Sequence, residues 1–138
     1  GGRSEPALRR TAKIGDGWLV SQATPEEAGV GVQKIKSMAS EFGNHIEDDH
    51  YGAIFSYCFA DNPKEAQQLA SPYLLRRRHD VNPSQMNAFG TPEDLISMLD
   101  SYISSGVTKF ALRPACPPEM THQQMEILGK DVIPRYHN

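Results

Sequence analysis

The chain opens with Gly1-Gly2-Arg3-Ser4-Glu5, and Gly15-Asp16-Gly17-Trp18-Leu19-Val20 follows one short helical stretch later. A Gly-Gly turn with no initiator Met, leading at once into a Ser-capped helix, is what remains when a strand–helix unit is cut at the end of its strand. Residues 18–20 are apolar and typical of a short buried strand. These two segments predict the later portion of a larger α/β enzyme.

Helical and strand patterns alternate along the rest of the chain. Helices are expected from Ser4 to Gly15, Thr24 to Gly43, Asp61 to about Pro72, Thr91 to Gly106, and from Thr121 onward. The strands expected between them span residues 18–20, 53–60 and 109–113, and residues 76–89 are expected to be irregular. This order favours a parallel sheet covered by helices.

Capping and apolar periodicity predict the positions of particular side chains in these helices. Thr121 and Gln124 match a capping box, in which each side chain bonds a backbone N–H at the start of a helix. Ile14 and Ile103 fall on the apolar stripes of their helices, so both are expected to face inward.

Composition and charge narrow the classes of function. The 138 residues are 38% hydrophobic and 22% charged, which is typical of a globular domain. A net charge of −3 argues against a nucleic-acid partner, and no apolar run approaches the roughly 20 residues of a membrane span. Cys58 and Cys116 are too few for a disulfide framework, which favours a reduced, cytoplasmic setting. The expected partner is a small molecule.

The number of strands limits the architecture. A closed (β/α)8 barrel needs eight strands and about 250 residues, so this chain supplies only about half of one. We therefore expect residues 1–138 to form a single partial domain, a half-barrel. An open sheet of that size leaves an apolar edge and face uncovered. It is expected to pair with its missing half or with a copy of itself.

The first turn contains groups that suit an anion. Gly1 and Gly2 allow close approach of the backbone, Ser4 supplies a hydroxyl and helix amides, and Arg3 supplies a guanidinium. The same four residues also fit a plain strand-to-helix turn with a Ser cap. The motif alone leaves both interpretations open.

Read together, the two opening segments resemble the luciferase-like monooxygenase family of flavin and deazaflavin enzymes. Later segments are also similar to the C-terminal half of that family: Thr24-Pro25-Glu26-Glu27, Asn62-Pro63-Lys64-Glu65-Ala66, Gly90-Thr91-Pro92-Glu93-Asp94 and Gly106-Val107-Thr108-Lys109-Phe110. The resemblance implies an oxidoreductase or monooxygenase with a TIM-barrel fold that acts on a small organic substrate. It implies flavin mononucleotide (FMN) or the deazaflavin coenzyme F420 as cofactor. Strands five to eight are represented, the fifth only by its final turn.

The resemblance also implies roles for particular residues. Those implied to hold the cofactor phosphate are Gly1, Gly2, Arg3 and Ser4, and those implied to line the cofactor cleft are Trp18 and Leu19. Active sites of TIM barrels lie in the loops after the strands, which makes Ser21, Gln22 and Arg113 the substrate-side candidates. No catalytic acid or base is assigned, because the cofactor performs the redox step in such enzymes.

Several alternatives accompany this interpretation. Without the resemblance, Trp18 is most simply a core residue. The residues from His45 to His50 suggest a metal-dependent hydrolase, although a solvated loop is favoured. Arg76 to His79 suit either an anionic ligand or a charged helix end. Cys116 is a candidate reactive thiol, whereas Cys58 is expected to be inert. A different class of function is a non-catalytic half-barrel that dimerises and binds a phosphate-bearing ligand.

Overall fold

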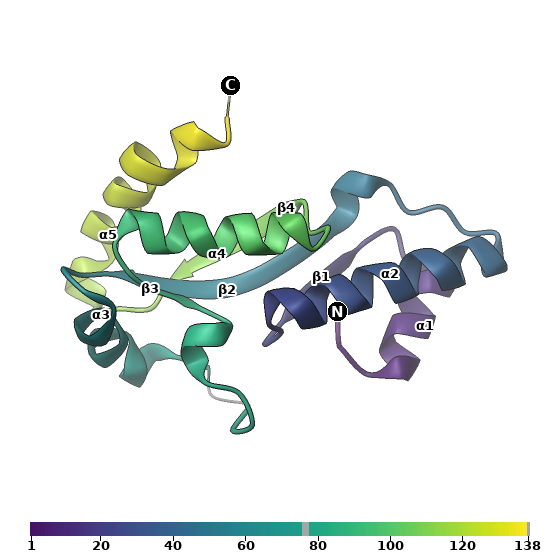
Figure 1. The fold of residues 1–138 in the computed structure, drawn as a ribbon, viewed down its shortest axis with the longest axis horizontal. Helices are drawn as coiled ribbons and strands as arrows, with labels where there is room; N and C mark the ends of the chain where they lie inside the picture. Colours follow the sequence, from purple (N-terminus) through teal and green to yellow (C-terminus); the bar gives the residue numbers. More distant parts are fainter. Residues whose placement is uncertain (76–77, 138) are drawn as a thin grey trace. The chain divides into compact units, whose positions relative to one another are not determined.

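Strands and helices alternate along the chain in the computed structural model, which describes residues 1–75 and 78–137 (Figure 1). The helices are α1 (Glu5–Ile14), α2 (Pro25–Phe42), α3 (Pro63–Ala70), α4 (Pro92–Ser104) and α5 (Thr121–Ile127). The strands are β1 (Trp18–Ser21), β2 (Tyr51–Phe59), β3 (Ala88–Gly90) and β4 (Lys109–Pro114). The predicted parallel α/β class is confirmed. Strand β3 was not predicted and lies at the end of the segment expected to be irregular.

The chain divides into two compact units. The first contains Gly1–Phe55 and Asp100–Ala111, and the second contains Ser56–Leu99 and Leu112–Asn138. Strand β2, helix α4 and strand β4 each contribute residues to both units. Within the described residues, no helix is long and apolar enough to cross a membrane.

Local signals explain the helices of the first unit, where α1 packs against α2 (Figure 1). The Ser4 hydroxyl accepts a hydrogen bond from Ala7 N at 3.4 Å and caps α1. Thr24 and Glu27 form the predicted capping box of α2. Gly43 ends α2 with φ 68°, a conformation that favours glycine. Strand β1 pairs in parallel with β2, from Trp18 opposite Tyr51 to Ser21 opposite Ile54.

The core of the first unit lies between its strands and helices. Trp18 and Val20 of β1 are buried, as are Val32 and Ile35 of α2. The Phe55 and Tyr102 rings stack at 5.1 Å, and the Tyr102 hydroxyl donates to Ala23 O at 2.6 Å. Burial raises the pKa of Tyr102 well above its ordinary value.

Two of the expected inward positions are exposed. Ile14 is 72% exposed because it is the last residue of α1, beyond the buried positions of that helix. Ile103 is 43% exposed, since the neighbouring Tyr102 takes the inward position and adjacent residues of a helix point about 100° apart.

In the second unit, β3 pairs in parallel with β2, with Cys58 opposite Phe89. Helix α3 packs against β3 (Figure 1), and Ala66, Ala70 and Cys116 complete a small apolar core. Strand β4 also pairs with β2, and Ala115 N donates to Tyr57 O at 2.8 Å.

Gln124 does not take part in the expected capping box. The chain already turns helically over Pro118–Met120, so Thr121 has helical dihedral angles and α5 has no side-chain cap. The Gln124 side chain is instead 1% exposed and bonds the backbone of Phe59. Phe59 N donates to Oε1 at 2.7 Å, and Nε2 donates to Phe59 O at 3.0 Å. The amide therefore replaces a neighbouring strand at the end of β2.

Candidate cofactor site

The first turn of the chain has the geometry that its glycines predict. Gly2 has φ 106°, which side-chain-bearing residues rarely adopt. A Cβ on Gly1 would lie 2.8 Å from Leu19 O, and one on Gly2 would lie 2.9 Å from Ala7 Cβ. The turn therefore packs too closely on β1 and α1 for any other residue. Gly1, Gly2, Arg3 and Ser4 are all exposed, so the backbone ahead of α1 is open to a ligand.

Trp18 lies directly behind this turn. Its indole Nε1 donates to Gly2 O at 3.0 Å, and the side chain is only 3% exposed. Leu19 is on the opposite face of β1 and is 48% exposed. Trp18 thus belongs to the core face of the strand and contacts the turn through its hydrogen bond, whereas Leu19 faces away from that core.

Gly31 of α2 is a residue of this site that sequence reasoning did not assign. A Cβ at Gly31 would overlap Cη2 of Trp18 and would lie 3.0 Å from both Cζ2 and Cζ3. The signal available in the sequence was a glycine in the interior of a helix, where it weakens the helix unless close packing requires it. Gly31 therefore marks the place where the indole lies against α2.

A cleft of about 340 Å³ opens beside the turn. It is lined by Trp18 with Leu8, Val30 and Gly31, and by the charged residues Arg3, Glu26, Glu27 and Lys34. Arg3 lies 4.0 Å from the Glu27 carboxylate, which also accepts from Thr24 N at 3.0 Å. Lys34 forms an ion pair with Glu5. The cleft thus joins an apolar wall to a rim on which opposite charges are balanced.

The substrate-side candidates of the first unit follow directly after β1. Ser21 is exposed at the end of the strand, and Gln22 is half-buried. Gln22 has φ 56° and is the one non-glycine residue with positive φ among those the structure describes. Backbone strain of this kind is concentrated at functional sites, which supports a role for this turn.

Gln22→Gly is expected to have a free energy of unfolding about 0.5–1 kcal/mol higher than Gln22→Ala, which removes the same side-chain amide but keeps a Cβ at φ 56°. Glycine adopts positive φ without the steric cost that a Cβ imposes, and this gain exceeds its extra chain entropy. Urea denaturation measures the change, with Gln33→Gly in the interior of α2 as the control that loses stability. A Gln22→Gly variant no more stable than Gln22→Ala would contradict the strain assigned to this turn.

Arg113, the third substrate-side candidate, lies in the second unit. Its Nη2 donates to the Ser56 hydroxyl and to Tyr73 O, both at 3.1 Å. Ser56 N in turn donates to Asn87 Oδ1 at 2.9 Å. Arg113 therefore connects β4, β2 and the turn at Tyr73 within this unit.

The residues from His45 to His50 are paired with their neighbours at the surface. His45 lies 3.1 Å from Glu47, Asp48 accepts from Lys36 at 2.7 Å, and His50 lies 3.7 Å from Asp49. The hydrogen bond and charge of Lys36 lower the pKa of Asp48. Across the described part of the chain, no three His, Cys, Asp or Glu side chains are grouped to hold a metal ion. These surface pairings favour the solvated-loop interpretation of the segment.

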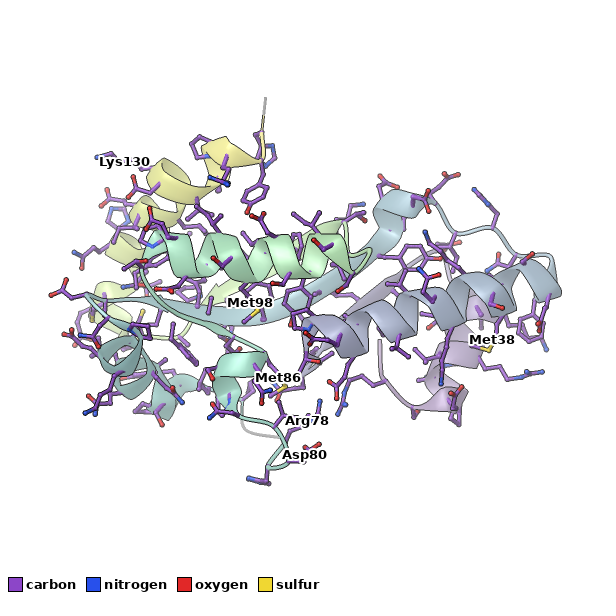
Figure 2. The ribbon with its side chains drawn as sticks, viewed as in Figure 1. Met38, Arg78, Asp80, Met86, Met98 and Lys130 are labelled. Carbon is purple, nitrogen blue, oxygen red and sulfur yellow. The ribbon has the colours of Figure 1, made fainter. Side chains whose placement is uncertain are left out.

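The arginine run is described only from Arg78 onward, because Arg76 and Arg77 lie outside the described residues. Figure 2 shows Arg78 and Asp80 close together on their loop, with Met86 nearby. Arg78 donates to both carboxylate oxygens of Asp80, at 2.6 and 3.0 Å, and its side chain is 8% exposed. This pairing favours a structural role for Arg78 over a role in binding an anionic ligand.

Both cysteines are buried in the second unit. Burial raises the pKa of Cys58 to about 11, so its thiol is protonated at neutral pH, as the inert interpretation expects. Cys116 is 5% exposed, and its Sγ lies 3.9 Å from the Thr121 hydroxyl. Its burial argues against the reactive-thiol interpretation.

Residues 1–95 match the model of the family described as luciferase-like monooxygenase. This match covers the turn, Trp18 and the cleft, as well as more than half of the chain. The chain therefore belongs to the luciferase-like monooxygenase family. No curated protein sequence matches it significantly.

Solved structures share the fold at low sequence identity. A coenzyme F420-dependent tetrahydromethanopterin reductase from Methanopyrus kandleri is 17% identical, with a TM-score of 0.75 over 99% of this chain and 50% of that one. An F420-dependent secondary alcohol dehydrogenase in complex with an F420–acetone adduct is 16% identical, with a TM-score of 0.73 over 96% of this chain and 46% of that one. The oxygenating constituent of 3,6-diketocamphane monooxygenase from Pseudomonas putida, in complex with FMN, is 14% identical, with a TM-score of 0.71 over 97% and 47%. The chain spans about half the length of these proteins.

Proposed function

We propose that this chain carries the phosphate end of the cofactor site in a flavin- or deazaflavin-dependent oxidoreductase that acts on a small organic substrate. The observation that carries the proposal is the turn at Gly1 and Gly2: Gly2 has positive φ, Gly1 packs closely on β1, and the backbone ahead of α1 is exposed. Membership of the luciferase-like family and the FMN- and F420-binding neighbours support the choice of cofactor.

Each residue of the turn has a physical task in this proposal. Pro6 has no N–H and Ala7 N donates to the Ser4 hydroxyl, so the donors proposed for a phosphate are the amides of Arg3, Ser4 and Glu5 together with the Ser4 O–H. The partial positive charge of the helix N-terminus favours the anion. Arg3 lies at the rim, 4.0 Å from Glu27, and adds a charge-assisted contact. The cofactor supplies the redox chemistry, while the protein binds and orients it. Ser21, Gln22 and Arg113 are proposed to contact the substrate.

The proposed phosphate site is tested with two ligands, FMN and riboflavin, which differ only in the phosphate group. We expect the 138-residue chain to bind FMN at least about tenfold more tightly than riboflavin, because only FMN carries the anion. Coenzyme F420, which also carries a phosphate, is titrated in parallel to choose between the two branches of the family. Fluorescence anisotropy of the ligands measures each Kd, and Trp18 fluorescence is followed in the same titrations.

Two variants assign the effect to the turn. Arg3→Ala is expected to lower the affinity for FMN, whereas Arg10→Ala, which removes an exposed cation from α1, is expected to leave it unchanged. Equal affinities for FMN and riboflavin in the unaltered chain would refute the proposed phosphate site.

A second candidate is a non-catalytic module that associates with a copy of itself. Leu19 and Ile54 are 48% and 37% exposed, and their positions in the register place them on one face of the β1–β2 pair. An exposed apolar face of this kind is typical of an interface. Light scattering on the titrated material separates the two candidates: twice the mass of the chain without FMN or F420 affinity would favour the module.

A further inference from the structure

We infer that Trp18 is a positioning residue that sets the direction of the turn's amides by holding the carbonyl of Gly2. This inference rests on the proposed phosphate site. It assigns Trp18 a role beyond that of lining the cleft, because the buried indole also donates a hydrogen bond to the turn.

The hydrogen bond fixes a whole peptide plane. Gly2 O accepts from the indole Nε1 at 3.0 Å, and this oxygen shares a peptide unit with the N–H of Arg3. The peptide is trans, so its C=O and N–H point in opposite directions. Holding the carbonyl towards the indole therefore aims the Arg3 amide away from the core. Without this hydrogen bond, Gly2 has more freedom than any other residue to rotate that plane.

The indole is itself held in place. Trp18 is in β1, which pairs with β2, and its ring lies against α2 where Gly31 leaves no room for movement towards the helix. Its hydrogen bond to Gly2 joins residues 16 positions apart in the sequence. A rigid strand and a rigid helix thus determine the conformation of a glycine turn that has little stiffness of its own. Preorganised donors of this kind bind an anion without a further ordering cost.

The decisive variant is Trp18→Phe, which keeps an aromatic ring and removes the N–H. We expect its affinity for FMN to fall about tenfold and its affinity for riboflavin to stay within about twofold, because only the phosphate depends on the turn. Val20→Ala is the matched control, since Val20 is buried on the same face of β1 and its side chain has no group that could hydrogen-bond the turn. It is expected to keep the preference of the unaltered chain for FMN.

The possible outcomes separate the inference from the proposed function. If the unaltered chain does not distinguish FMN from riboflavin, the proposed phosphate site fails and the inference fails with it. If the unaltered chain does distinguish them and Trp18→Phe keeps the same preference, only the inference is overturned. An equal loss of affinity for both flavins in Trp18→Phe would leave Trp18 as a core residue alone and would also overturn it.

A measurement on the unaltered chain covers the case in which Trp18→Phe does not fold. Nuclear magnetic resonance reports the exchange of the indole Nε1–H with solvent. We expect this proton to exchange slowly, and more slowly still with FMN but not with riboflavin. Rapid exchange in the free chain and in the FMN complex would show that the hydrogen bond to Gly2 is not maintained, and the inference would fall.

Discussion

Replacing Gln124 by Leu is expected to lower the free energy of unfolding by about 3 kcal/mol, the largest loss that we expect from a single side chain in this protein. The Gln124 amide accepts from Phe59 N at 2.7 Å and donates to Phe59 O at 3.0 Å. Leu has a similar volume but leaves both backbone groups without these bonds at a site where Gln124 is 1% exposed. Each buried group left unsatisfied costs about 1–3 kcal/mol.

Urea denaturation followed by circular dichroism measures this loss. Gln123→Leu is the control, because Gln123 is the exposed neighbour on the same helix and its replacement is expected to change the stability by less than about 0.5 kcal/mol. If the two variants were equally stable, the bonds to Phe59 would contribute nothing to the fold.

Gln124→Glu adds a dependence on pH to the same experiment. A protonated carboxyl can both accept from Phe59 N and donate to Phe59 O, as the amide does. Burial disfavours the charged form, so the folded state raises the pKa of this carboxyl above its unfolded value. The stability of the variant is therefore greatest below about pH 4.3, the ordinary pKa of Glu, and is lost as the pH rises. If Gln124→Glu were less stable than the unaltered chain by the same amount at every pH, the two hydrogen bonds proposed between this side chain and Phe59 would be contradicted.

The helices could be predicted because their signals are local. Ser4 and Thr24 cap α1 and α2, and Gly43 ends α2, as the sequence indicates. Strand β3 was missed because three residues are too short to show a period, and their strand conformation depends on pairing with β2. Gln124 was misassigned for a similar reason. A capping box and a buried amide have the same sequence pattern, and only the position of Phe59 distinguishes them.

In the candidate site, too, the local features could be predicted from the sequence, and the features that depend on packing could not. The glycine turn is encoded within four residues, and its exposed backbone and positive φ at Gly2 follow from them. The orientation of Trp18 was not encoded locally, because a four-residue strand can present either face to the core. Its hydrogen bond to Gly2 depends on how α1 and β1 pack together. The roles of the predicted site residues in binding stay predictions until ligands are titrated.

Gly31→Ala is expected to destabilise the protein by about 2 kcal/mol, although alanine is the better helix former by about 1 kcal/mol. The new methyl group would overlap Cη2 of Trp18, and the ring is confined between α2, β1 and the turn at Gly2. Gly129→Ala is the matched control. Gly129 lies in the helical turn Leu128–Val132 that continues α5, and a Cβ there meets nothing within 4 Å, so the same substitution is expected to gain about 0.5–1 kcal/mol. Urea denaturation of both variants measures the two changes in the free energy of unfolding, which are expected to have opposite signs.

A double-mutant cycle identifies the indole as the cause. Phe is smaller than Trp at the position that Cη2 occupies, so Gly31→Ala is expected to cost about 1–2 kcal/mol less in the Trp18→Phe background than in the unaltered chain. The same cycle connects α2 to the cofactor turn. A methyl group that displaces the indole also disturbs its hydrogen bond to Gly2, and Gly31→Ala is therefore expected to weaken FMN binding although residue 31 does not belong to the turn. If the stability effects of the two substitutions were additive, Gly31 and Trp18 would not constrain each other. This result would contradict the inference that an indole fixed by α2 orients the turn.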